Sequence, residues 1–321
     1  MKQLVILSGK GGTGKTSVTA AFAHLAAQGP FAGRVLLADA DVDAANLELV
    51  LQPRRLDTQP FRGGQVAVID EDRCLICGDC ESACRFDAIV ETDGRWVIDP
   101  IACDGCAACV YQCPTESIRM QEQRVGECRL SDSRYGPLHH AHLHPGQENS
   151  GKLVTQVRQR ARQQALDEER RLVIVDGPPG IGCPVIAAVS GADLALLVTE
   201  PTVSGIHDLR RALGTVQHFG VPALVCINKA DVYPKGARDI ETFCEANGIA
   251  MVGSIPFDPS IASALVAGEA VTAYRPEAPA SLALSALWER LVSVLVEPPT
   301  RQDDGFAEPI TDNLNQPGTF Q

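Results

Sequence analysis

The sequence predicts an α/β protein whose mostly parallel sheet is covered by helices on both faces. Three observations lead to this expectation. Short apolar runs alternate with helix-like stretches, a glycine-rich segment follows the first apolar run, and a cysteine-dense segment interrupts the alternation once. Apolar runs this uniform are typical of strands that are buried on both faces of a parallel sheet.

The elements follow from these periodicities in chain order. We expect strands at 3–7, 35–38, 172–175, 194–198, 223–227 and 249–254. We expect helices at 15–27, 152–170, 204–218 and 238–247, and a core-packed terminal helix at 281–296. The composition changes divide the chain into a first part of the sheet domain at 1–61, an insert at 62–124, the second part at 125–296 and a disordered tail at 297–321.

Charge and hydropathy exclude several classes of function. The formal net charge is −12, which disfavours nucleic-acid binding because phosphate contact needs clustered Lys and Arg. No apolar run approaches the length of a membrane span, and Leu4 to Leu7 is too short for the core of a signal peptide. We therefore expect a cytoplasmic protein without stable membrane association.

The segment "GKGGTGKT" at 9–16 follows the first expected strand and precedes the first expected helix. It satisfies G-x-x-x-x-G-K-[ST], the P-loop pattern, whose backbone N–H groups bind phosphate oxygens. Lys15 is expected to reach the β- and γ-phosphates, and the Thr16 hydroxyl to ligate Mg²⁺. The expected nucleotide-binding residues here are Gly9, Lys10, Gly11, Gly12, Thr13, Gly14, Lys15, Thr16 and Ser17.

Eight of the twelve cysteines form two runs, and a shift of 29 positions superimposes the first run on the second. Both runs follow Cys-x2-Cys-x2-Cys-x3-Cys, the bacterial ferredoxin spacing, in which the fourth cysteine serves the other cluster. That rule predicts one [4Fe–4S] cluster on Cys74, Cys77, Cys80 and Cys113, and a second on Cys84, Cys103, Cys106 and Cys109. The insert is therefore expected to be an α+β bacterial ferredoxin-like domain. Zinc is the alternative, although zinc sites favour separated cysteine pairs.

With these motifs in place, the chain resembles the MinD-superfamily P-loop ATPases that carry an inserted two-cluster ferredoxin domain. This group, described also as cobyrinic acid a,c-diamide synthase-like, belongs with ParA, Mrp and the nitrogenase iron protein. The resemblance rests on "SGKGGTGKTS", "DADVDAANL", both cysteine runs, "ENSGKLV", "DGPPGIGCPV" and "INKAD". No glutamine amidotransferase arrangement is apparent in the C-terminal part, so the diamide synthase label carries little weight.

The resemblance implies roles for particular residues. Lys10 matches the second lysine of a deviant Walker A motif and implies an ATP-bound homodimer, in which this lysine contacts the nucleotide of the opposite subunit. By the same resemblance Asp41 activates the attacking water, Asp39 and Asp176 support Mg²⁺, and Gly180 offers its N–H to the γ-phosphate. Lys10, Lys15 and Asp41 are then the catalytic residues.

"INKAD" at 227–231 leaves the choice of base open. Asn228 matches the adenine-contacting asparagine of the class, while Asp231 completes N-K-x-D, a guanine-reading pattern of many GTPases. The deviant Walker A motif favours ATP over GTP.

We expect a redox-coupled ATPase that passes electrons to a redox protein partner. Residues 66–118 contain eleven acidic side chains and three arginines, which gives a net charge of −8. Such a charge suits docking to a basic partner. The alternatives are a MinD- or ParA-like positional switch with structural clusters, and a cluster carrier of the Mrp kind. Two features remain open: Cys183, an inert cysteine or a further ligand with Cys128 as its loose partner, and the four histidines of 136–154, expected in a loop.

Overall fold

The computed structural model describes residues 1–144 and 151–296. A nine-stranded sheet forms its body, in the order β11-β10-β9-β1-β8-β2-β7-β6-β3. The first seven strands of this order run parallel, and β6 pairs with both of its neighbours in antiparallel fashion. The strands are β1 (Lys2–Ser8), β2 (Val35–Asp39), β3 (Arg54–Ile69), β6 (Ile118–Ser133), β7 (Gly136–Leu143), β8 (Leu172–Pro179), β9 (Leu194–Thr199), β10 (Ala223–Asn228) and β11 (Ala250–Ile255).

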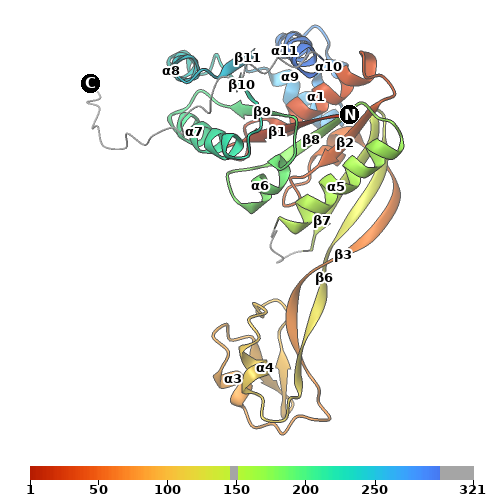
Figure 1. Ribbon diagram of the computed structural model, residues 1–321, viewed down its shortest axis with the longest axis vertical. Coiled ribbons are helices and arrows are strands. Elements are labelled where there is room, and N and C mark those ends of the chain that lie inside the picture. Colours follow the sequence, from red (N-terminus) through yellow and green to blue (C-terminus); the bar gives the residue numbers. More distant parts are fainter. Residues whose placement is uncertain (145–150, 297–321) are drawn as a thin grey trace, which may run out of the picture.

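Helices cover both faces of this sheet (Figure 1). One face packs against α1 (Lys15–Gln28), α2 (Leu47–Leu51), α9 (Pro259–Ala267), α10 (Val271–Tyr274) and α11 (Pro279–Val296). The other face packs against α5 (Lys152–Asp167), α6 (Cys183–Val189), α7 (Val203–His218) and α8 (Pro234–Ala246). The expected fold class, strands and helices of this body are confirmed, because alternating apolar strands and helices leave a parallel sheet few other ways to be buried.

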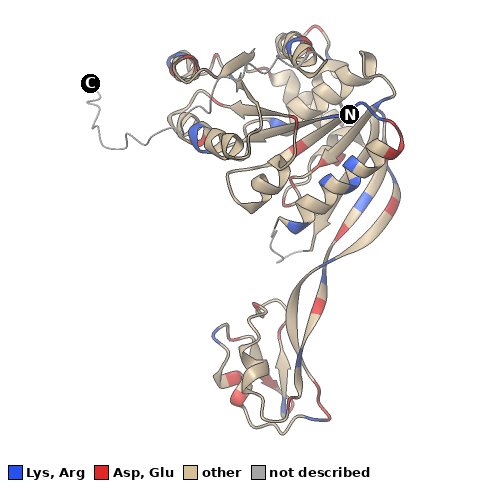
Figure 2. Ribbon diagram, in the orientation of Figure 1, with Lys and Arg blue, Asp and Glu red and all other residues tan. Residues whose placement is uncertain are grey.

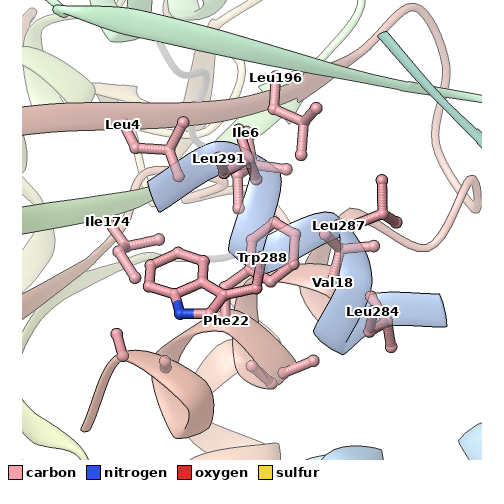
Figure 3. Packing of buried hydrophobic residues seen from close by; sticks show 14 of the residues in the cluster. Leu4, Ile6, Val18, Phe22, Ile174, Leu196, Leu284, Leu287, Trp288 and Leu291 are labelled. Atoms are coloured by element: carbon pink, nitrogen blue, oxygen red, sulfur yellow. The ribbon is translucent and has the colours of Figure 1, made fainter. Parts of the chain in front are cut away.

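The first face is closed by α11, the expected core-packed terminal helix (Figure 3). Trp288 lies against Phe22 with ring centroids 5.2 Å apart, and Leu284, Leu287 and Leu291 fill the space toward the sheet. Among the described helices, α11 alone has the length and composition that a membrane span requires. Its burial in this cluster accounts for that apolar character.

The cysteine-rich segment forms a separate lobe at the end of a long twisted ribbon made by β3 and β6 (Figure 1). The lobe holds α3 (Asp79–Ser82), α4 (Ala108–Gln112) and a hairpin of β4 (Ile89–Thr92) and β5 (Arg95–Ile98). Its small core contains Ala67, Ile89 and Ile118 together with buried Cys80 and Cys109. Acidic side chains are more frequent than basic ones along this lobe (Figure 2).

Two expectations require correction. The boundaries placed at 62 and 124 fall inside β3 and β6, because the ladder continues through the register shifts around Arg62 and Gln65 into the body sheet. The histidines were expected in a loop, but 136–143 form strand β7, which pairs with β2 and β6. Residues 145–150 and the tail expected to be disordered, 297–321, lie outside the described residues.

Candidate functional site

The phosphate loop joins β1 to α1, and its backbone requires glycine at two positions. Gly12 and Gly14 have φ values of 78° and 93°, in the left-handed region that other residues rarely adopt. A Cβ atom on Gly14 would also overlap the side-chain amide of Asn228. Since Gly14 directly precedes α1, the loop amides and the helix N-terminus face the same space, which suits a bound phosphate.

Two hydroxyls and one carboxylate form the next part of the site. Thr16 Oγ1 donates to Asp176 Oδ2 over 2.7 Å, and Thr19 Oγ1 donates to Asp176 Oδ1 over 2.9 Å. Asp176 is fully buried in the second half of β8, so burial raises its pKa, which the two hydroxyls and Lys15 act to lower. A buried carboxylate beside the P-loop threonine provides hard oxygen ligands, the kind that Mg²⁺ prefers.

The acidic segment after β2 is held in place by its own backbone. Asp39 accepts hydrogen bonds from the N–H groups of Asp41 and Leu47, each over 3.1 Å. Burial, followed by the nearby charge of Asp176, raises the pKa of Asp39 well above its usual range. Asp41 lies 4.0 Å from Lys15 Nζ. Burial raises its pKa to about 6, although Lys15 acts to lower it.

A cavity of about 580 Å³ opens over these groups. Asn228 Nδ2 donates to the Thr13 carbonyl over 2.8 Å, which ties the end of β10 to the phosphate loop. The cavity is lined by Gly11, Gly12, Gly14, Lys15, Thr16, Ser17, Asp41, Asp43, Ala44, Asn46, Pro178, Pro179, Pro184, Asn228, Lys229, Pro256, Phe257, Asp258, Pro259, Ile261, Ala262 and Leu265. Cationic and N–H groups at one end and apolar side chains at the other suit a phosphorylated nucleoside.

The cysteines gather around two further small cavities in the lobe. Cys74, Cys77, Cys80 and Cys113 line the first one, with Ile69, Leu75, Trp96 and Ile118. Cys84, Cys103, Cys106 and Cys109 line the second, with Phe86, Ala88, Ile89 and Ile98. Each cavity thus receives three cysteines from one run and the fourth from the other, as the ferredoxin rule expects. None of these eight cysteines is in a disulfide bond.

The thiols differ in their surroundings. Burial raises the pKa of Cys80 and of Cys109, which lie in the core of the lobe. For Cys113 burial also acts to raise the pKa, but hydrogen bonds from Ser117 and Thr115 outweigh it and lower the pKa to about 7. Ser117 N donates to the Cys113 sulfur over 3.3 Å. Such donors stabilise the thiolate form, which is the form that binds metal.

Comparison with known proteins bears on this geometry. Residues 4–271 match the family described as CobQ/CobB/MinD/ParA nucleotide binding domain. The chain belongs to this family. It is 32% identical over 259 residues to an uncharacterized protein of Methanocaldococcus jannaschii, a match that covers 80% of this chain and 84% of the relative.

Two further likenesses are informative. The structure of the septum site-determining protein MinD with Mg-ADP from Pyrococcus horikoshii shares the fold, with a TM-score of 0.53 and 20% identity over 92% of this chain and 99% of that chain. A 72-residue segment, 22% of this chain, is 40% identical to 12% of the indolepyruvate oxidoreductase subunit IorA from Methanothermobacter marburgensis.

Within this CobQ/CobB/MinD/ParA chain, seven residues predicted for the nucleotide and Mg²⁺ site are not part of the cavity lining: Gly9, Lys10, Thr13, Asp39, Asp176, Gly180 and Asp231. Lys10 Nζ forms an ion pair with Glu200 Oε2 at 3.0 Å, and Glu200 Oε1 accepts from Lys229 over 2.6 Å. Gly180 N donates to the Ser8 carbonyl over 2.9 Å. Asp231 Oδ1 accepts from the backbone N–H of Phe257 over 2.6 Å, so it positions a residue of the lining.

Sequence reasoning missed some residues of this nucleotide-binding domain and left others unassigned. Thr19 and Glu200 carry no motif signal, and only their contacts with Asp176 and Lys10 reveal them. Cys183 is exposed at the start of α6, while Cys128 lies on β6 and is buried among apolar side chains. Neither cysteine lines the nucleotide cavity or the two cysteine cavities described above.

Proposed function

We propose that this chain is an ATPase in which nucleotide binding controls electron transfer through two [4Fe–4S] clusters. The observation that carries the proposal is the sorting of eight cysteines into two quartets, each lining its own cavity and each drawn from both runs. Four thiolates around one cavity form the soft donor set that iron–sulfur clusters use. Apolar side chains such as Trp96 and Phe86 line the same cavities and limit the access of water.

The bound clusters would supply one-electron transfer, and the chain's residues would hold and tune them. Hydrogen bonds from Ser117 and Thr115 to the Cys113 sulfur stabilise negative charge on that ligand. Such hydrogen bonds are one of the means by which a protein sets the reduction potential. Because the lobe carries an excess of acidic side chains, we infer that the redox partner presents a basic surface.

On the nucleotide side, we assign phosphate binding to the loop amides and Lys15. Thr16 and Asp176, which are already joined by a hydrogen bond, would bind Mg²⁺. Asp39, which is paired with Asp176 across strands β2 and β8, would support this site. Asp41 would orient the attacking water, since its carboxylate faces the cavity 4.0 Å from Lys15 Nζ. Asp231 has one oxygen occupied by Phe257 N–H, which favours ATP over a guanine nucleotide.

A second subunit would complete the ATP-bound state. Lys10 projects from the loop, and its ammonium group is paired with Glu200 within the same chain. In an ATP-bound homodimer it would leave Glu200 and reach the nucleotide of the partner subunit. The Lys229–Glu200 pair, at 2.6 Å, would keep Glu200 neutralised after that exchange.

The lobe and the nucleotide site share one sheet, which is the physical basis for coupling them. The ribbon strands β3 and β6 continue into the body next to β7, and β7 pairs with β2, whose end carries Asp39 and Asp41. Only β7 separates β2 from the ribbon strand β6. A rearrangement of the acidic segment would therefore act on the ribbon through β7. The likeness of a 72-residue segment to part of an oxidoreductase subunit is consistent with the redox proposal.

The test is an anaerobic stopped-flow measurement of electron transfer from the reduced protein to a protein acceptor, with Mg-ATP, Mg-ADP or no nucleotide. We expect the rate to change at least several-fold with ATP. Lys15→Ala, which keeps all eight cysteines, should transfer electrons at one rate in all three conditions. Equal rates for the unaltered protein, together with unshifted EPR spectra, would contradict the coupling.

The likeness to MinD favours a second candidate, a positional switch whose clusters are structural. That function predicts ATP-dependent binding to a surface or scaffold and no dependence of electron transfer on nucleotide. Liposome flotation with Mg-ATP distinguishes the two, because only the positional switch predicts ATP-dependent binding to a surface. The core packing of α11 favours an absence of flotation.

A further inference from the structure

A cluster of two histidines and one glutamate lies on the sheet where the ribbon leaves the body. His140 and His142 are two residues apart on β7, so their side chains project from the same face of the strand. Glu48 lies in the first turn of α2, on the chain segment that follows Asp41, and it meets both imidazole rings. Neither the nucleotide site nor the cysteine cavities use these three side chains.

The three ligand-type atoms are mutually close. Glu48 Oε1 is 2.8 Å from His142 Nε2, Glu48 Oε2 is 3.1 Å from His140 Nδ1, and all three groups fall within 4.8 Å of one another. Ligands placed about 2.0–2.1 Å from a tetrahedral ion lie roughly 3.3 Å from each other. The spacing of the cluster therefore already approximates that of a metal site.

His140 supplies the second, independent observation. Its side chain is only 2% exposed, and Nδ1 has no hydrogen-bond partner among the described residues, because the contact with Glu48 lacks hydrogen-bond alignment. The other ring nitrogen, Nε2, lies 2.9 Å from Ser131 Oγ. When Nε2–H donates to Ser131, Nδ1 presents a lone pair toward the carboxylate, and a cation placed between them would satisfy both groups.

Arg129 is a competing cation at this cluster. The main partner of Arg129 is Glu127, at 3.1 Å, whereas its distance to Glu48 is 3.8 Å. The charge of Glu48 therefore remains available to another cation.

We propose that Glu48, His140 and His142 bind a divalent transition metal ion of the zinc type. Two imidazoles and one carboxylate are a donor set that Zn²⁺ uses, with a fourth position left for water. An open groove lined by Glu48, His140, Ser131 and Arg55 gives the ion a path from solvent. Ser131 is a positioning residue, since it orients the His140 ring from the side opposite to the metal.

Such an ion would join two segments that are far apart in the sequence. Leu47 N donates to Asp39 Oδ2, so α2 is attached directly to the acidic segment of the nucleotide site. β7 pairs with β6, which continues into the ribbon. The metal would thus fasten the helix that follows the acidic segment to the strand next to the ribbon. This site does not depend on the proposed electron transfer.

The experiment uses the full-length protein, purified anaerobically and dialysed to equilibrium against buffered Zn²⁺, with zinc and iron measured per chain by mass spectrometry. We expect the unaltered protein to bind one zinc ion more than His142→Ala and than Glu48→Gln, at equal iron content. Ser131→Ala should bind zinc about 10- to 100-fold more weakly. Zinc should raise the melting temperature of the unaltered protein and leave that of His142→Ala unchanged.

His139→Ala is the matched control, because His139 is on the same strand but faces α5, where its Nε2 lies 2.7 Å from Gln164 Oε1. It should retain the extra zinc ion. Equal zinc in the unaltered protein and in His142→Ala would overturn the proposal and assign the bound metal to the cysteines. This comparison gives the same answer whether or not the clusters are present, so it is independent of the proposed function.

Discussion

Among single residues, Asp41 has a carboxyl group whose chemistry depends strongly on its surroundings. Burial raises its pKa to about 6, against the influence of Lys15, so its charge changes close to neutral pH. Asp39 and Asp176 have raised pKa values for the same first reason, burial. Three carboxyl groups so close together require a cation for all of them to be ionised, and Mg²⁺ with Lys15 would provide it.

The first prediction concerns pH. If ionised Asp41 orients the attacking water, ATP hydrolysis should fall about tenfold per pH unit below the apparent pKa of Asp41, which is about 6 without Mg²⁺ and is lowered when Mg²⁺ is bound. Steady-state phosphate release between pH 5 and 8 measures this. Asp41→Asn should abolish hydrolysis and leave Mg-ATP binding intact, and a variant that hydrolyses at more than a tenth of the normal rate would contradict the assignment.

The same shift predicts a change in stability with a definite sign. A carboxyl group whose pKa is raised on folding binds more protons in the folded state than in the unfolded state. Asp41 therefore lowers the free energy of unfolding progressively as pH rises from about 4 to about 6. Without nucleotide, Asp41→Asn should therefore be more stable than the unaltered protein at pH 7. The difference should vanish near pH 4, as urea unfolding at both pH values would show.

The cysteine pairing can be tested by iron content. Cys80→Ser should reduce the iron from roughly eight to roughly four atoms per chain. Adding Cys113→Ser should change little, because both residues line the same cavity, whereas adding Cys84→Ser should remove nearly all remaining iron. The opposite result, with Cys84→Ser neutral and Cys113→Ser severe in the Cys80→Ser background, would mean that each run holds its own cluster.

At the scale of elements, α11 closes one face of the sheet through Trp288, which contacts Phe22 and Phe31. Trp288 is 5% exposed, so Trp288→Ala leaves a cavity and should lower the free energy of unfolding by about 3–5 kcal/mol. Leu282→Ala on the same helix is the control, since Leu282 is 59% exposed and should cost less than about 0.5 kcal/mol. Urea denaturation measures both, and equal losses would contradict this account of the core.

The strand β7 shows where sequence patterns mislead. Four histidines with proline and glycine at either end favour a loop, yet each of 139, 140 and 142 has a partner on a different element. His139 contacts Gln164 on α5, and His140 contacts Ser131 on β6. His140 and His142 both contact Glu48 on α2. The polar strand is stable because its neighbours on both faces supply hydrogen bonds, and these neighbours are distant in sequence.

At the scale of the whole molecule, the proposed homodimer predicts a dependence on Lys10. Mg-ATP should convert the Asp41→Asn protein from monomer to dimer in size-exclusion chromatography with light scattering. Adding Lys10→Ala should retain ATP binding, because Lys15 and the loop amides remain, but prevent the dimer. Lys2→Ala, at an exposed ion pair with Asp193, is the control. A dimer unaffected by Lys10→Ala would contradict the trans contact.

The sequence by itself determined the α/β body, the phosphate loop and the two cysteine runs, because each depends on local spacing: apolar periodicity, glycine positions and ligand intervals. Tertiary structure alone decided that β3 and β6 extend into a ribbon, that Asp231 accepts a hydrogen bond from Phe257 N–H, and that Glu48 contacts two histidines. These contacts join residues up to 94 positions apart, and no local pattern specifies them. Only the folded sheet brings α2, β7 and the ribbon together.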